Sequence, residues 1–123
     1  MSKKNNTMDS IIGVNSIIKG EVEVKGTIRI DGRFEGIIKA DWVIIGKTGN
    51  FEGEIAASAV LVSGQLSGKV ISSDFVEIKQ SGKVIGDIET DRIIILEGGR
   101  FEGKSIIKRD LSKTKKPELI SNS

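Results

Sequence analysis

Apolar and polar residues alternate along most of this chain with a period of two. The alternation is clearest in six pairs of aliphatic residues, each pair separated by one residue: Val22/Val24, Ile28/Ile30, Val43/Ile45, Val60/Val62, Val76/Ile78 and Ile93/Ile95. Period-two alternation over short β-branched segments is typical of strands that bury one face and expose the other. We therefore predict an all-β body that begins near Ser10.

A second pattern, apolar-x-Gly-x-aliphatic, recurs along the same segments. Its copies read IKGEV, FEGII, FEGEI, LSGKV, VIGDI and FEGKS, of which the last lacks the aliphatic residue. The glycines of the six copies are Gly20, Gly36, Gly53, Gly68, Gly86 and Gly103. Successive glycines are 16, 17, 15, 18 and 17 residues apart. A nearly fixed period of this length indicates a solenoid, in which each repeat stacks on the next.

The repeat length predicts how many sides each turn has. A repeat of about 16.6 residues divides into three sides of about 5.5 residues, which is a common strand length plus a corner. The glycine motif supplies one side, the alternating pairs a second, and remaining segments such as residues 47–50 and 80–83 a third. Glycine disfavours helix by about 1 kcal/mol per residue. We predict a three-sided parallel β-helix of about six rungs, each about 4.8 Å high.

The motif residues are the predicted core. Phe34, Gly36 and Ile38 share one parity, so we expect Gly36 to point inward and leave room for a large ring in the narrow interior. The alternative is that these glycines simply serve turns. The predicted core repeat comprises Phe34, Gly36, Phe51, Gly53, Leu66, Gly68, Val84, Gly86 and Gly103. Trp42 is expected as a partly buried corner residue, with an outward interaction anchor as the alternative.

Composition excludes most catalytic chemistry. The chain has no cysteine and no histidine, which excludes disulfides, cysteine or histidine-assisted nucleophiles and histidine-based zinc sites. Hexapeptide-repeat acyltransferases have a similar repeat architecture, but they rely on a catalytic histidine. No GxxxxGK[ST] phosphate loop occurs, and the pairs Asp31/Glu35 and Glu52/Glu54 read as a solvated charged surface. We predict no enzyme activity, no metal and no cofactor.

Charge is distributed unevenly. The net charge is +2, but residues 104–123 carry six basic and two acidic side chains, and residues 1–9 two basic and one acidic, so residues 10–103 have a net charge of −3. The basic residues lie without interleaved aromatics in a tail, which disfavours nucleic-acid binding. No secretory signal and no apolar run of about 18 residues are present. We expect a cytoplasmic protein.

The ends of the predicted rod suggest self-association. We divide the chain into a disordered tail (1–9), a β-helix domain (10–107) and a disordered basic tail (108–123), and neither tail offers a cap of the kind that repeat proteins use. Open rungs can join and continue the strand ladder into a filament without nucleotide. The predicted polymerisation residues are Phe101 and Ile106 at one end and Ile11, Ile12 and Val14 at the other. The alternative is a monomeric β-helical adaptor that binds a protein through a charged face.

The repeats resemble those of the bactofilin family. The similar strings are DGRFEGII, VIIGKTGNFEGEI, VLVSGQLSGKV and GDIETDRIIILEGGRFEGK, and together they extend over nearly all of residues 11–104. The resemblance implies a bacterial cytoskeletal protein with a right-handed, three-sided β-helix between disordered tails. Right-handed crossovers are also the rule for parallel strands. In this family a phenylalanine of the last rung matters for assembly, and Phe101 stands at the matching position.

The resemblance also implies a cellular setting. Its members assemble spontaneously into non-polar filaments by head-to-head contact, often at the inner face of the cytoplasmic membrane, where they localise cell-wall enzymes and shape the cell. Members that touch the membrane commonly use an apolar residue near Met1, which MSKKNNT lacks. The candidate contacts for an anionic membrane or a protein partner are therefore Lys3, Lys4, Lys113, Lys115 and Lys116. The alternative is that both tails are solubilising linkers.

Overall fold

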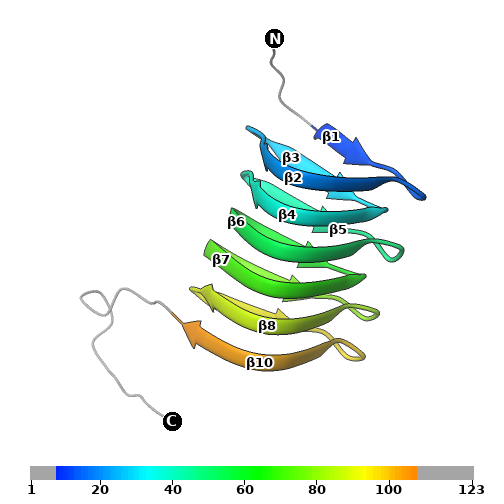
Figure 1. The fold of residues 1–123 in the computed structure, drawn as a ribbon. Coiled ribbons are helices and arrows are strands. Elements are labelled where there is room, and N and C mark those ends of the chain that lie inside the picture. The colour runs from blue at the N-terminus through cyan, green and yellow to red at the C-terminus, as the bar shows by residue number, and fades with distance from the viewer. Residues whose placement is uncertain (1–7, 108–123) are drawn as a thin grey trace, which may run out of the picture.

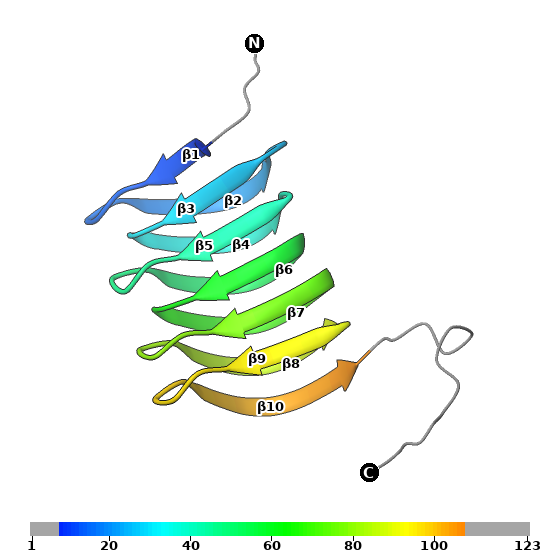
Figure 2. The ribbon, with the colours of Figure 1, turned by 180° about the vertical axis from the view of Figure 1, so that it is seen from behind.

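The computed structural model describes residues 8–107, which form ten strands and no helix. The strands are β1 (Met8–Ile12), β2 (Ile17–Glu23), β3 (Thr27–Ile30), β4 (Arg33–Lys39), β5 (Trp42–Ile45), β6 (Asn50–Val62), β7 (Gln65–Ile78), β8 (Lys83–Thr90), β9 (Arg92–Ile95) and β10 (Arg100–Ile107). They climb as stacked turns from the N-terminal to the C-terminal end (Figure 1; from behind in Figure 2). The predicted fold class, an all-β parallel solenoid of about six turns, is confirmed.

The first strand starts slightly earlier than the sequence pattern suggested. Strand β1 begins at Met8, two residues before the expected start of the domain. The last strand ends at Ile107. The predicted disordered tails therefore lie outside the described residues, apart from Met8 and Asp9.

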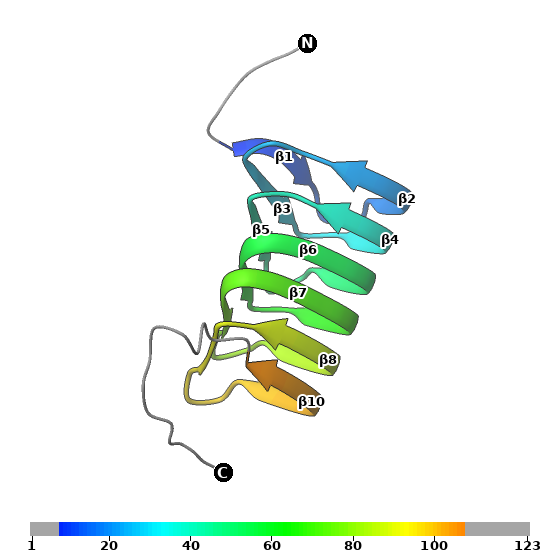
Figure 3. The same cartoon turned by 90° about the vertical axis from the view of Figure 1, so that its left-hand side faces the viewer.

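All strand pairs are parallel, and the glycine motif is in register throughout. The motif glycines pair in one row from rung to rung: Gly20, Gly36, Gly53, Gly68, Gly86 and Gly103. The first residues of the motif form a parallel row: Ile18, Phe34, Phe51, Leu66, Val84 and Phe101. Each turn therefore repeats the previous one, one strand spacing further along the rod (Figure 3).

The uneven period of 15 to 18 residues comes from two variable connections. The corner after the motif strand has two residues in most turns and three at residues 24–26 and 72–74. The turn before the next motif strand has four residues, except at residues 31–32 and 63–64, where it has two. Relative to a repeat of 17 residues, a two-residue connection shortens the repeat by two and a three-residue corner lengthens it by one. These two changes reproduce all five glycine spacings. The motif segments themselves stay paired residue for residue in every turn.

The core is a set of ladders inside the rod. Phe34, Phe51, Leu66 and Val84 are buried, and the rings of Phe34 and Phe51 are stacked with their centroids 5.4 Å apart. The aliphatic rows on either side, such as Ile30, Ile45, Val62 and Ile78, are likewise at 0% exposure. Residues of the same kind pack on one another from rung to rung, which buries apolar area without an interlocking second sheet.

The reason proposed for the motif glycines is wrong. A Cβ on Gly36 would not enter the interior; it would overlap the backbone carbonyl oxygen of Gly20 in the neighbouring rung. Gly36 and its equivalents also have φ between 128° and 139°, a region that residues with side chains rarely adopt. Glycine is therefore required because each rung approaches the backbone of the previous one along the rod axis.

The segments assigned to the third side, residues 47–50 and 80–83, lie mostly in four-residue turns. Residues 46–49, 79–82 and 96–99 each close with a hydrogen bond from the fourth backbone N–H to the first carbonyl, for example from Gly49 to Gly46 at 2.8 Å. The motif strands are instead long and curved, and β6 and β7 run on into the second side (Figures 1 and 2). A hydroxyl in a four-residue turn donates a hydrogen bond to the two-residue turn of the preceding rung. Thr48 donates to the Asp31 carbonyl and Ser81 to the Ser63 carbonyl, both at 2.7 Å.

Candidate assembly surfaces

The two ends of the rod have unpaired strand edges. At the N-terminal end β1 pairs only with β3 and β2 only with β4, within residues 8–107. At the C-terminal end β9 pairs only with β7 and β10 only with β8, within the same range. A strand with one partner leaves a row of backbone N–H and C=O groups that can pair with another chain. Twelve strand residues supply this edge at each end.

Apolar side chains surround the N-terminal edge. Ile11, Val14 and Ile17 are 63%, 58% and 67% exposed, and Ile18 is 38% exposed. Ile12 is half-buried and packs against the core, where it ends the row of Ile30. Of the predicted residues, Ile12 therefore lies at the inner opening of the rod. Ile11 faces outward in the row of Arg29, and Val14 lies in the turn at residues 13–16.

The C-terminal edge has a similar opening. Phe101 is half-buried against the core and ends the row that begins at Ile18. Ile106 is 59% exposed, but it pairs with Glu89 in an outward row, so it does not continue the core. The inward position of the last rung is Ser105, which lies on the buried Ile88. Phe101 therefore lies at the opening and Ile106 at its outer rim.

Sequence reasoning missed two further residues at the openings. Ile18 continues the phenylalanine row at the N-terminal end, and Ile95, 48% exposed, continues the row of Ile78 at the C-terminal end. Both positions were visible in the repeat, because Ile18 opens its weakest copy and Ile95 closes the last alternating pair. The candidate tail contacts Lys3, Lys4, Lys113, Lys115 and Lys116 lie outside the described residues.

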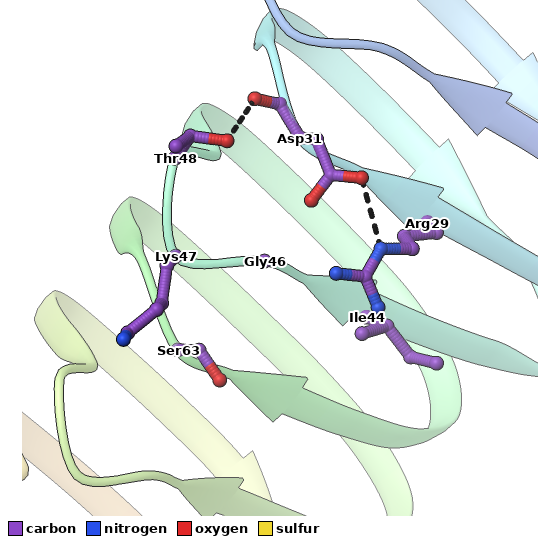
Figure 4. A pocket seen from close by; sticks show the side chains of 7 residues that line it. All are labelled: Arg29, Asp31, Ile44, Gly46, Lys47, Thr48 and Ser63. Carbon is purple, nitrogen blue, oxygen red and sulfur yellow. Dashed lines mark hydrogen bonds and ion pairs between the residues drawn. The ribbon is translucent and has the colours of Figure 1, made fainter.

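The charged side chains on the rod pair with one another. Arg33 Nε donates to Glu35 at 2.9 Å, and Arg33 Nη2 lies 3.8 Å from a carboxylate oxygen of Glu52. Arg29 Nε donates to Asp31 at 2.9 Å, and this hydrogen bond, together with the carboxylate charge, raises the pKa of Arg29. A hollow of about 420 Å³ lies between this pair and the turn that contains Lys47 (Figure 4). The hollow is open and is lined by this ion pair, by Lys47 and by small polar residues, so it does not resemble an enclosed catalytic pocket.

Trp42 directly follows the corner at residues 40–41 and is partly buried, as predicted, although it lies on an outward row. It is 41% exposed, and its ring lies edge-on to Phe75 with centroids 5.8 Å apart. The described part of the chain holds no group of three carboxylates placed to bind a metal ion. It also contains no helix long and apolar enough to cross a membrane.

Comparison with known proteins agrees with this geometry. Residues 10–106 match the family model for bactofilin, described as polymer-forming cytoskeletal. Bactofilin BacO of Myxococcus xanthus (strain DK1622) is 31% identical over 96 residues, which span 77% of this chain and 76% of BacO. Bactofilin BacP of the same organism is 27% identical over 105 residues, which span 85% of this chain but only 44% of BacP.

A solved structure has the same fold. The structure described as the cytoskeletal bactofilin BacA, determined by solid-state NMR, superposes with a TM-score of 0.74 and is 29% identical in sequence. The match covers 81% of this chain and 96% of the BacA chain.

Proposed function

The chain belongs to the bactofilin family of cytoskeletal proteins, and from this we propose that its copies join end to end, without nucleotide, into non-polar filaments. The observation that carries the proposal is the pair of open ends of the described rod, residues 8–107, where strand edges without a partner in that range surround exposed core rows. Joining two rods at these ends continues the hydrogen-bond ladder and covers the apolar openings at the same time.

The residues at the openings have distinct roles in this proposal. Phe101 extends the core of one copy toward the next, while Ile12 and Ile18 do so at the other end. Strand edges can pair in parallel or antiparallel fashion, so like ends can meet, as the bactofilin resemblance implies. The contact needs only backbone pairing and apolar burial, and the chain has no phosphate-binding loop motif, so no nucleotide enters the step.

Phe101→Arg tests the end contact directly. A charge at the half-buried end of the core row would have to be desolvated on joining, so we expect rods of the correct fold that no longer form filaments in electron micrographs. Ile85→Arg is the matched control, because Ile85 is 41% exposed on an outward row. Filaments of unchanged length in Phe101→Arg, with the β spectrum intact, would contradict the proposal. Monomeric unsubstituted protein of 13.3 kDa would favour the adaptor alternative.

We further propose that the filaments lie in the cytoplasm at the inner face of the membrane and support cell shape and the placement of cell-wall enzymes. Each lysine near an anionic surface contributes about 1 kcal/mol, and a filament presents many copies of Lys3 and Lys4, which multiplies a weak contact. Co-sedimentation with anionic liposomes of the full chain, and of chains lacking residues 1–9 or 108–123, tests the tails. Equal pelleting of all three would remove them from the proposal.

A further inference from the structure

One side of the rod has outward residues arranged in a self-complementary order. This side, called here the pairing face, is formed by β1, β3, β5, residues 59–62 of β6, residues 75–78 of β7, and β9. Strand pairing places its outward residues in rows along the rod. The middle row reads Ile11, Arg29, Ile44, Leu61, Glu77 and Ile94.

When the middle row is placed opposite the same row in reverse order, aliphatic residues face aliphatic residues and opposite charges face each other. Reversal about the midpoint between Ile44 and Leu61 places these two aliphatic residues opposite each other. One step outward, Arg29 exchanges with Glu77, and at the ends Ile11 exchanges with Ile94. The row that follows reads Gly13, Asp31, Gly46, Ser63, Lys79 and Leu96, because each residue directly follows the strand row before it. About the same midpoint Asp31 exchanges with Lys79, so two opposite-charge exchanges share one centre.

The remaining row of this face contains two aromatic residues. It contains Thr27, Trp42, Ala59, Phe75 and Arg92. The rings of Trp42 and Phe75 meet edge-on over Ala59, which is fully covered. The two rings form a ridge whose centre, at Ala59, lies half a rung spacing from the midpoint of the middle row. In a reversed second copy the ridge is displaced to the other side of the midpoint. The two ridges then face each other over the two central rungs, where Trp42 of each copy lies opposite Ala59 of the other, and Phe75 lies opposite the smaller Thr27 of the other copy.

We propose that the pairing face binds the same face of a second copy, with the two rods antiparallel and related by a two-fold axis between Ile44 and Leu61. A two-fold axis brings each residue opposite its exchange partner twice, as in isologous interfaces. Arg29 then faces the partner's Glu77, and Asp31 faces the partner's Lys79. The occupant is a second copy because the charge order matches its own reverse, which an unrelated protein would match only by chance.

The charged residues are placed to make these contacts. Within one copy Arg29 lies 2.9 Å from Asp31, and Lys79 lies 3.3 Å from Glu77, in opposite order along the strand direction. The Arg29 and Lys79 side chains are 42% and 40% exposed, so both reach solvent. The hollow of about 420 Å³ beside Asp31, seen in Figure 4, leaves room for the partner's Lys79. The Arg29–Asp31 pair of one copy then faces the Glu77–Lys79 pair of the other, and the four charges alternate in sign.

The small area of the pairing face makes the association of two single rods weak. Five rung steps of about 4.8 Å and four residues of about 3.3 Å give a footprint of about 24 by 13 Å. This is well below the roughly 800 Å² per partner of a standard interface. The contact would be multiplied wherever rods are joined end to end. The inference itself does not depend on end-to-end joining, because the pairing face excludes the end openings.

Charge reversal in two separate chains tests the pairing. In an Ile18→Arg/Phe101→Arg background, which places a charge at both end openings, sedimentation at up to about millimolar concentration should show association to twice the 13.3 kDa chain mass. Arg29→Glu alone and Glu77→Arg alone each bring like charges together twice, and each should weaken pairing by about tenfold or more. An equimolar mixture of the two variants restores opposite charges at both contacts and should pair again. Trp42, the one tryptophan of the chain, should change its emission in parallel.

The outcomes separate this inference from end-to-end assembly. A parent that stays monomeric over the whole concentration range, or a mixture that pairs no better than either single variant, would overturn the pairing face. If the unsubstituted chain forms no filaments, the proposed function fails, and the charge-reversal series is then run on the unsubstituted chain. Where filaments do form, Arg29→Glu should leave their length unchanged and separate laterally paired filaments into single ones.

Discussion

The middle rungs and the end rungs of this rod contain the same repeat but have different surroundings. Along one core row Ile30, Ile45 and Ile78 have 0% exposure, whereas Ile95 at the end of the row is 48% exposed. Phe51 is fully buried and Phe101 half-buried, although both begin the sequence FEG. The difference teaches that exposure at the ends comes from a missing neighbour and not from a change in sequence.

Under the proposed end-to-end joining, this difference divides the stabilising contacts between the single chain and the assembly. A middle rung makes hydrogen bonds and apolar contacts on both sides, so its full stability is present in one copy. An end rung makes them on one side, and repeat proteins whose terminal units lack caps are correspondingly weaker there. Substitutions in middle rungs should therefore lower folding stability, while equivalent substitutions at the ends should chiefly affect assembly.

Gly53→Ala should give the largest loss of stability. The added Cβ would overlap the backbone of Gly36, and alanine would be held at a φ of 138°. Backbone strain and overpacking each cost about 1–3 kcal/mol, so their sum reaches up to about 6 kcal/mol. Urea unfolding followed by circular dichroism measures the effect. A loss below about 1 kcal/mol would show that the rungs move apart easily.

Gly20→Ala is the same change at the N-terminal end. Its φ is 135°, but no atom lies within 4 Å of the added Cβ, so only the strain of about 1–3 kcal/mol remains. In a filament the Cβ would point at the backbone of the joined copy. We expect a folded rod that does not polymerise, whereas normal filaments would show that another surface makes the contact.

Phe51→Ala and Phe101→Ala compare the same row in the middle and at the end. Phe51 is fully buried and stacked on Phe34, so its truncation should cost about 3–5 kcal/mol of folding stability. Within residues 8–107 the strand position of Phe101 has a paired neighbour on one side only, and we expect less than half that loss. Thermal unfolding of both variants in the same Gly20→Ala background, in which filaments do not form, gives the ratio of the two losses. Equal losses would mean that the ends are as well packed as the middle.

Much of the fold was predictable because the repeat determines it. The motif spacing and the alternating pairs together indicated a parallel solenoid of about six turns, and both patterns correspond to continuous rows in the structure. The function of Gly36 was not predictable, since parity alone suggests an inward side chain. The positive φ turns the absent Cβ toward the neighbouring rung, and no single-strand pattern reveals that direction.

The end residues were harder to predict than the core. Ile106 was chosen because it is apolar and close to Phe101, but the strand register gives the inward position to Ser105. In a strand, a displacement by one residue moves a side chain to the opposite face, so hydrophobicity alone cannot decide. The pairing face depends on residues from six rungs, and its symmetry becomes visible only after the short turns and long corners have been aligned.

Ser72→Ala tests a buried corner in the middle of the rod. The Ser72 hydroxyl is within 2.7 Å of the Ser58 carbonyl and 3.0 Å of the Phe75 carbonyl, and the residue is 5% exposed. Alanine would leave a buried carbonyl without this donor at a cost of about 1–3 kcal/mol. Thr90→Val is the counterpart near the C-terminal end, where the hydroxyl lies 3.3 Å from the Arg92 carbonyl. Chemical denaturation should show the smaller loss for Thr90→Val, and the reverse order would contradict the comparison.

Thr48→Val and Ser81→Ala should give the smallest effects, because the hydroxyls they remove lie at the surface. Each hydroxyl bridges a long turn to the preceding short turn at 2.7 Å, and exposed hydrogen bonds of this kind contribute about 0.5–1.5 kcal/mol. Water can replace the lost donor at both sites, so folding and filament length should be unchanged. Hydrogen exchange of the Gly49 and Gly82 amides, which close the two long turns, should nevertheless become faster in the matching variant only. Faster exchange across all rungs would mean that the turns, and not the stacked strands, maintain the register of the rod.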